Sequence, residues 1–135
     1  MLRTQPTIWV STVSSEGRPH LVPVWFYWDR THIYFGSQGD AKKIRNIAAR
    51  PYATLALPDT QDVIIVEGNA GFVQPSEMGA ALTGYGDKYA EAMQAMDMNL
   101  EEREDFRLVR VIPQKYLVWN MTSNNNAVDA SEDSK

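Results

Sequence analysis

Residues 35–47 read FGSQGDAKKIRNI and contain the sharpest change of pattern in the chain. An apolar strand pattern stops at Gly36 and Gly39, and a helical pattern follows directly. Asp40 has the short polar side chain of an N-cap residue, and Pro51 ends the helical pattern. The segment therefore predicts a strand, a tight connection, and a helix that begins at Asp40.

The start of this helix is a candidate phosphate site. A helix N-terminus offers free backbone N–H groups and a partial positive charge. Lys42 and Lys43 add two cationic side chains there, and Asn46 lies within the same two turns. The simpler alternative is a capped helix with solvated lysines. Asp40 favours that alternative, because its own carboxylate would occupy part of the anion position.

The composition describes one globular domain. The chain has 135 residues, of which 44% are apolar and 22% are charged. A formal charge of −4 argues against nucleic acid or an anionic membrane as a partner. The absence of cysteine and the presence of only two histidines argue against a metal site. No apolar run is long enough to span a membrane, so a cytoplasmic location is expected.

The sequence predicts six strands. Their ranges are 7–13, 19–28, 31–37, 52–57, 62–73 and 106–119. Helical segments follow the third and fifth strands, and Gly84-Tyr85-Gly86 in the second segment is interpreted as a helix break. Barrel closure removes exposed strand edges, so the predicted class is mainly β (α+β), with an antiparallel barrel over residues 1–121. Residues 122–135 are predicted to be a disordered tail.

The second predicted strand contains a proline inside an apolar run. Pro23 cannot donate a ladder hydrogen bond, so it is expected at an edge or at a split in the barrel. Val24, Trp25 and Phe26 follow directly and are suited to line a flat heteroaromatic ring. The alternative is an edge strand whose aromatic residues belong to the core.

Together these blocks resemble the pyridoxamine-phosphate-oxidase-like family of flavin-binding split barrels. The resemblance extends over residues 8–120, and the order and spacing of its blocks are more specific than any block alone. The blocks are GRPHLVPVWF at 17–26, SQGDAKKIRNI at 37–47, Arg50-Pro51, Glu67-Gly68, VIP at 111–113 and Trp119.

The resemblance implies a homodimer of six-stranded split barrels with two cofactor sites at the subunit interface. It implies FMN as the cofactor, with the deazaflavin F420 as the alternative and haem in a few relatives. Lys42 and Lys43 would hold the cofactor phosphate, helped by Ser37 and Asn46. Pro23 would belong to the cofactor site, and Val24, Trp25 and Phe26 would lie along the ring system. Trp119 would approach the cofactor from the partner subunit.

Departures from the family pattern narrow the function. The oxidases that form pyridoxal phosphate carry an Arg-x-His motif near the C-terminus, and the sequence NMTSNNN after Trp119 lacks it. Pyridoxal phosphate formation is therefore rejected. In the N-terminal lead only Arg3 is available to hold the acidic tail of F420, which favours FMN.

The expected activity is that of an FMN-binding oxidoreductase acting on a small organic substrate. A flavin supplies the hydride chemistry itself, which accounts for the lack of a visible catalytic constellation. No catalytic residue is assigned, since a histidine such as His20 is more often a surface or interface residue than a proton donor. The alternatives are an F420-dependent oxidoreductase of the same fold and a non-catalytic protein that binds flavin or haem.

Overall fold

The computed structural model describes residues 1–96 and 105–121. The tail predicted over residues 122–135 lies outside the described residues. The helices are α1 (Lys42–Ala49), α2 (Gly79–Lys88) and α3 (Ala90–Ala95), with a 3₁₀ turn at Pro75–Glu77. The strands are β1 (Ile8–Val13), β2 (Pro19–Val24), β3 (Tyr27–Trp28), β4 (Ile33–Gln38), β5 (Tyr52–Ala56), β6 (Asp62–Phe72) and β7 (Phe106–Asn120).

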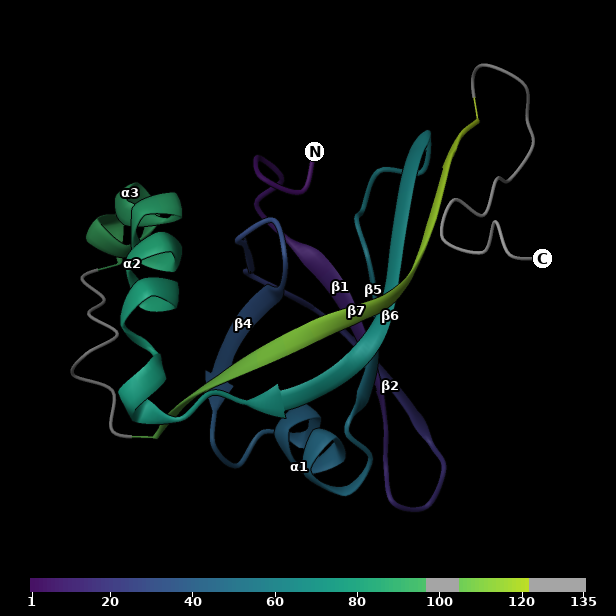
Figure 1. Cartoon of the computed structure of the whole chain (residues 1–135), viewed down its shortest axis with the longest axis horizontal. Helices are drawn as coiled ribbons and strands as arrows, with labels where there is room; N and C mark the ends of the chain where they lie inside the picture. Colours follow the sequence, from purple (N-terminus) through teal and green to yellow (C-terminus); the bar gives the residue numbers. More distant parts are fainter. Residues whose placement is uncertain (97–104, 122–135) are drawn as a thin grey trace.

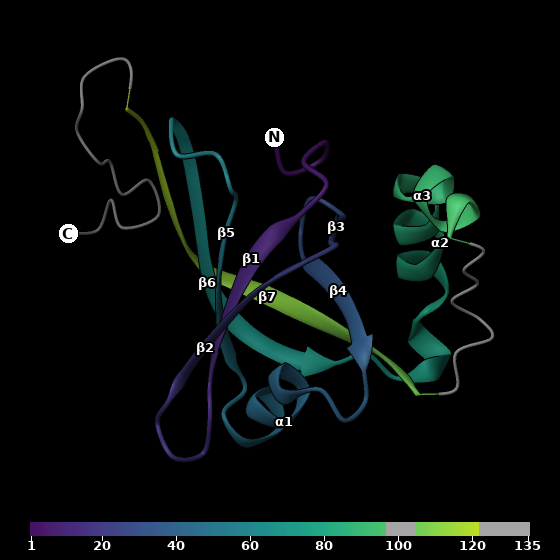
Figure 2. The ribbon, with the colours of Figure 1, turned by 180° about the vertical axis from the view of Figure 1, so that it is seen from behind.

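The described strands form one antiparallel sheet in the order β2-β1-β5-β6-β7-β4-β3. The sheet curls into a half-barrel, with α1 below it and α2 and α3 standing beside β4 (Figures 1 and 2). The prediction of a mainly β, antiparallel split barrel is confirmed. Pro23 lies on the edge strand β2, which is where its missing N–H is tolerated.

The predicted count of six strands is wrong, because the sheet has seven. The difference lies in the segment 19–28, which was predicted as one strand and is broken at Trp25 and Phe26. β2 pairs with β1, whereas β3 pairs with β4. The two halves of this segment therefore belong to opposite edges of the curled sheet, and the break between them is the split.

Side chains from the end of α2 replace the missing ladder at the break. The backbone N–H of Phe26 donates to the Tyr89 hydroxyl at 2.8 Å, and that hydroxyl lies 2.9 Å from the carbonyl oxygen of Phe26. Lys88 Nζ donates to the same carbonyl at 2.9 Å. The Tyr89 hydroxyl also lies 2.6 Å from the carbonyl oxygen of Pro6. Phe26 thus has its backbone groups satisfied without a strand partner.

One main core fills the concave side of the sheet. Ile8, Val10 and Thr12 alternate with more exposed residues along β1, which is the period of a strand with one face on a core. α1 adds Ile44 and Ile47 to the same core. Full burial of side chains of this size contributes about 1.5–3 kcal/mol each. The helix is therefore held by its apolar face rather than by its length.

The prediction of Asp40 as the helix N-cap is wrong. The N-cap is Ala41, which makes no side-chain capping bond. Its N–H donates to the carbonyl of Gln38 at 3.1 Å, and its own carbonyl accepts from the N–H of Ile44 at 3.0 Å. This turn after β4 delays the helix by one residue, so Asp40 lies in the turn and its carboxylate does not cap the helix.

α2 and α3 pack against the region of the break through a smaller aromatic cluster. Tyr85, Tyr89 and Met93 are buried, with Trp25 and Tyr27 packed against them. None of the described helices is long and apolar enough to cross a membrane.

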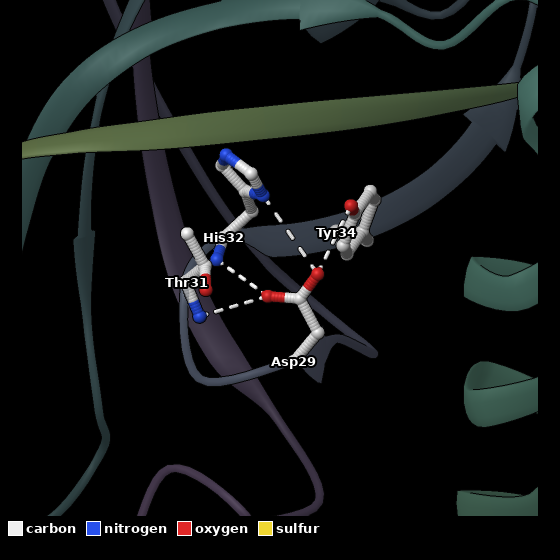
Figure 3. A network of polar contacts seen from close by, with 4 residues as sticks. All are labelled: Asp29, Thr31, His32 and Tyr34. Carbon is white, nitrogen blue, oxygen red and sulfur yellow. Dashed lines mark hydrogen bonds and ion pairs between the residues drawn. The ribbon is translucent and has the colours of Figure 1, made fainter.

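The turn from β3 to β4 is organised by one carboxylate (Figure 3). Asp29 Oδ1 accepts from the backbone N–H groups of Thr31 at 2.9 Å and His32 at 2.6 Å. Asp29 Oδ2 accepts from the Tyr34 hydroxyl at 3.2 Å and lies 3.7 Å from Nδ1 of His32. Partial burial raises the pKa of Asp29, but the hydrogen bonds from His32, Thr31 and Tyr34 outweigh it, so the pKa lies below the ordinary 3.8.

We predict that Asp29→Ala lowers the free energy of unfolding at pH 7 by about 1 kcal/mol, after allowance for solvent screening. Because the folded-state pKa is depressed, the carboxylate stabilises the fold above its unfolded pKa and stops doing so as the pH falls through the folded value. The difference between wild type and variant should therefore shrink below pH 3.8. Urea denaturation at pH 7 and at pH 3 measures it.

Asp59→Ala is the matched control. Asp59 Oδ1 accepts from the N–H groups of Gln61 at 2.7 Å and Asp62 at 3.0 Å, in the same kind of turn but in an exposed position. Asp59→Ala should lower the free energy of unfolding less than Asp29→Ala does. Equal losses in the two variants, or an Asp29→Ala effect that does not depend on pH, would contradict the role given to the Tyr34 and His32 contacts.

Candidate functional site

A pocket of about 370 Å³ opens where the end of β4 meets the starts of α1 and β7 and the flank of α2. The volume lies within the roughly 300–1,000 Å³ typical of small-molecule sites. Its lining combines the broken strand with β4, α1, α2, β7 and the end of α3. The lining residues are Val24, Trp25, Gly36, Ser37, Gln38, Ala41, Lys43, Tyr85, Met96 and Phe106.

Gly36 sets the depth of the pocket beside β7. A Cβ built on Gly36 would collide with the ring of Phe106, so only glycine lets that ring lie against the backbone of β4. The requirement is one of space and not of backbone conformation. Gly36 and Phe106 both line the pocket, which makes their contact part of its wall.

The strand break leaves an open backbone position beside this wall. The β3–β4 ladder ends at the pair Tyr27 and Tyr34. Gly36 lies two residues further along β4 and, among the described strands, pairs only with Leu108 of β7. On the side of Gly36 that faces away from β7, the phenol of Tyr85 forms a hydrogen bond with the Gly36 backbone. A side chain of α2 thus stands where a closed barrel would have a strand.

The polar side of the pocket is the start of α1. Ala41 offers no capping side chain, and within the described residues no acceptor is found for the backbone N–H groups of Lys42 and Lys43. The Lys43 side chain is half-buried, and burial lowers its pKa below the ordinary 10.5. Among the described residues that line the pocket, Lys43 carries the only formal charge. This end of the pocket is therefore suited to an anion.

Aromatic side chains form another part of the lining. Trp25 stacks on Tyr89 with ring centroids 4.5 Å apart and planes within 1°. Tyr85 lies at 5.2 Å from Tyr89 and is tilted by 46°. Phe106 and Met96 also line the pocket. The stack fixes the orientation of the indole, so the pocket presents a preformed flat wall of the kind that planar ring systems prefer.

Four of the sequence-predicted residues come together in this pocket. Val24 and Trp25 arrive from the break after β2, Ser37 from β4 and Lys43 from α1. They were predicted from segments about twenty residues apart in the sequence, and the curl of the sheet brings them to one place.

The other predicted residues lie elsewhere in the described chain. Pro23 and Lys42 are exposed and do not line the pocket, while Phe26 is fully buried in the main core. Asn46 is buried and its Nδ2 donates to Oγ1 of Thr12 at 3.0 Å. Trp119 lies near the far end of β7, about 40 Å along the strand from Phe106 at roughly 3.3 Å per residue.

Sequence reasoning missed the contribution of α2. Gly84-Tyr85-Gly86 was interpreted as a helix break, but it lies inside α2. Gly84 is there because a Cβ would collide with the ring of Tyr27, so the helix packs directly on that ring. The spacing of Tyr85 and Tyr89, four residues apart, was the signal that could have placed both on one helical face.

A curled antiparallel half-barrel, split at one strand and with a pocket beside the split, defines a domain of the split-barrel class. A comparison with protein families identifies which one. The family model described as Pyridoxamine 5'-phosphate oxidase matches residues 1–120, so the chain belongs to this family. The comparison with curated proteins gives no match.

Several solved structures share the fold. The heme storage protein HutZ from Vibrio cholerae is 21% identical, with a TM-score of 0.70, and the match covers 84% of this chain and 86% of that one. An F420 reductase is 24% identical with a TM-score of 0.67, covering 85% and 91%. A pyridoxamine 5'-phosphate oxidase-related, FMN binding protein from Nostoc punctiforme is 14% identical with a TM-score of 0.69, covering 90% and 78%. At these identities the likeness is one of fold.

The contact between Gly36 and Phe106 leads to a test of the pocket wall. We predict that Gly36→Ala destabilises the protein by about 1–3 kcal/mol, because the added methyl group must displace a ring that packs against the strand. Chemical denaturation measures the loss. Gly36→Ala combined with Phe106→Leu should recover part of it, since the smaller side chain leaves room for the methyl group.

Gly71→Ala is the matched control, because Gly71 also lies in a strand but a Cβ there meets nothing within 4 Å. This variant should unfold like wild type. If Gly36→Ala were as stable as Gly71→Ala, the close contact with Phe106 would be refuted.

Proposed function

We propose that this protein binds FMN in the pocket described above and acts as a flavin-dependent oxidoreductase on a small organic substrate. The single observation that carries the proposal is that one pocket is lined both by an uncapped helix start with Lys43 and by aromatic side chains. FMN has the matching chemistry: a phosphate at one end and a planar ring at the other.

The phosphate is assigned to the start of α1. The N–H groups of Lys42 and Lys43, for which the described part of the chain offers no acceptor, supply donors, and the Lys43 ammonium supplies charge beside them. Ser37 also lines the pocket and adds a hydroxyl donor. Asp40 lies outside the cap position, so the competing carboxylate considered from the sequence does not occupy the helix start.

The ring is assigned to the aromatic side. Trp25 is held by its stack on Tyr89, and Phe106 is held against Gly36, so both walls are in place before a ligand arrives. Preorganisation of this kind reduces the entropy lost on binding. When bound, FMN supplies the hydride and electron transfer, and the protein supplies position and exclusion of water.

The pocket favours FMN over the two other cofactors found among the structural relatives. One relative is an F420 reductase and another stores heme. A single cationic side chain among the described lining residues matches one phosphate better than an extended acidic tail. No imidazole is found among those residues, whereas heme iron is commonly held by one.

A homodimer is part of the proposal. Trp119 lies too far along β7 to reach the pocket of its own chain, so a role at the cofactor requires a second subunit. The outer face of β1 and β2 also carries exposed apolar side chains, with Trp9 at 39% and Leu21 at 60% exposure. Trp9 lies directly opposite Pro23 in the ladder. Contiguous apolar surface of this kind is typical of an interface.

A flavin-binding protein without turnover is the second candidate. One observation favours it: the described residues lining the pocket include no carboxylate that could move a proton. Reduction of the bound flavin by NAD(P)H, followed by oxidation with a panel of quinone, nitro and enone acceptors, separates the two. Turnover supports the oxidoreductase, and its absence across the panel supports the binding protein.

We predict that Lys43→Ala weakens FMN binding about 10- to 100-fold, the effect of losing a charge-assisted contact worth roughly 1.5–3 kcal/mol. Quenching of flavin fluorescence on titration with protein measures the dissociation constant. The absorption spectrum of the purified wild type, with mass analysis of the released ligand, shows first which cofactor the protein carries.

Lys42→Ala is the matched control. It removes the same charge from the neighbouring residue, but the Lys42 side chain is exposed and does not line the pocket. Its effect should be less than threefold, as expected for a screened surface charge contributing roughly 0–1 kcal/mol. Equal effects of the two substitutions would argue against phosphate binding at this pocket.

Exchange of subunits tests whether Trp119 acts from the partner. Lys43→Ala and Trp119→Ala homodimers are both expected to bind FMN weakly. After the two variants are unfolded together and refolded, random pairing gives about half heterodimers, each with one intact and one doubly altered site. About a quarter of all sites should then bind FMN with wild-type affinity.

If Trp119 acted on the pocket of its own chain, no mixed dimer would contain an intact site, and no recovery would be seen. A wild-type chain that sediments as a monomer at micromolar concentration would also contradict the dimer. Each variant should first be shown to unfold cooperatively, so that loss of binding is not loss of fold.

A further inference from the structure

Two tyrosines one helical turn apart have hydroxyl groups in opposite situations. Tyr85 lies in α2, and Tyr89 is the first residue after the end of that helix. Both side chains are buried, with exposures of 4% and 5%. They belong to one aromatic cluster and differ chiefly in what their hydroxyl groups contact. The difference separates a structural role from a binding role.

The Tyr89 hydroxyl makes its hydrogen bonds with backbone groups of the fold. It accepts from the N–H of Phe26 and lies within hydrogen-bonding distance of the carbonyl oxygens of Phe26 and Pro6. Its single proton therefore already has acceptors. Tyr89 does not line the pocket where Trp25 and Tyr85 meet. A ligand in that pocket is therefore not expected to form a hydrogen bond with this hydroxyl.

The Tyr85 hydroxyl has one hydrogen-bond partner among the described residues. It forms a hydrogen bond with the backbone of Gly36, whose N–H is the group that the strand break leaves without a ladder partner. Gly36 and Tyr85 both line the pocket, so this bond lies in the pocket wall. Among the described residues, no acceptor is found for the phenol proton. That proton is available to a bound molecule.

The phenol remains neutral under ordinary conditions. Burial raises the pKa of Tyr85 well above its ordinary value of 10, the neighbouring Tyr89 raises it further, and the hydrogen bond with Gly36 lowers it in part. A neutral phenol is a donor, whereas a phenolate would only accept. The tilted contact with Tyr89 at 5.2 Å also restricts the ring, so the donor direction is fixed.

We infer that Tyr85 donates a hydrogen bond to the polar edge of the ring bound in this pocket and so acts as its specificity-determining donor. The inference rests on the proposed function, since FMN is the ring considered. It defines a direction for the ligand, with the phosphate at Lys43 and an oxygen or nitrogen acceptor of the ring at Tyr85.

The redox state of the ring provides a specific signature. Reduction makes the flavin ring system richer in electrons, and a donor hydrogen bond to a more negative acceptor is stronger. Tyr85 should therefore hold reduced FMN more tightly than oxidised FMN, which raises the midpoint potential of the bound cofactor. A residue that only supports the fold would weaken both states equally and leave that potential unchanged.

The test compares Tyr85→Phe with wild type, both loaded with FMN. We expect about tenfold weaker binding of oxidised FMN, about a hundredfold weaker binding of reduced FMN, and a midpoint potential lower by about 30 mV for that extra tenfold in a two-electron couple. Fluorescence titration gives the affinity for the oxidised state. Spectroscopic titration against a reference dye gives the potential.

Tyr89→Phe is the matched control, because it also removes one buried hydroxyl but not one at the pocket. It is expected to lower the thermal midpoint and to weaken both redox states of FMN equally through Trp25, which leaves the FMN potential within error of wild type. Tyr85→His, which keeps an N–H donor on a planar ring, should return part of the lost potential at pH 8. It also covers the case in which Tyr85→Phe does not fold.

Three results decide the matter. A wild-type potential in Tyr85→Phe, or an equal shift in Tyr89→Phe, overturns the inference while leaving FMN binding intact. No binding of FMN to wild type in either redox state overturns the proposed function, and the inference with it. A shift confined to Tyr85→Phe, with recovery in Tyr85→His, supports both.

Discussion

The split in the barrel depends on how two backbone groups at Phe26 are satisfied. Phe26 is fully buried, so its N–H and C=O must find partners. In a continuous strand these would be ladder bonds, which would draw the two edges of the sheet together. Tyr89 and Lys88 supply the partners instead. The chain can therefore leave β2, cross to the other edge as β3, and keep the opening beside β4.

Lys88 shows the cost of this solution. Its ammonium lies 3.6 Å from the centroid of the Phe26 ring as well as on the Phe26 carbonyl, and burial lowers the pKa of Lys88 to about 8. A cation in this position is compensated by the aromatic face and by one charge-assisted hydrogen bond. The aromatic cluster of α2 and α3 thus provides the polar partners of the break and, through Tyr85, one wall of the pocket that the break opens.

The sequence was sufficient where local pattern decides the structure. Alternation and turn residues located the strands, and a proline in an apolar run placed β2 at an edge. It was insufficient where the partner is remote. The break at Trp25 and Phe26 depends on Tyr89, sixty-three residues from Phe26, and no periodicity in the strand reveals it. Phe26 was assigned to the ligand from the sequence, whereas its side chain lies in the main core, against which Val24 also packs.

The segment before β1 contacts the same Tyr89 hydroxyl that satisfies the backbone of Phe26 at the strand break. Leu2 is buried in the main core, and the carbonyl of Pro6 lies on the Tyr89 hydroxyl. Displacement of residues 1–6 would therefore remove one of that hydroxyl's partners and loosen the ring against which Trp25 is stacked. The position of residues 1–6 and the packing of Trp25 at the pocket become mechanically linked, although many residues separate them along the polypeptide. A bulky fusion at Met1 would act on the cleft through the same linkage.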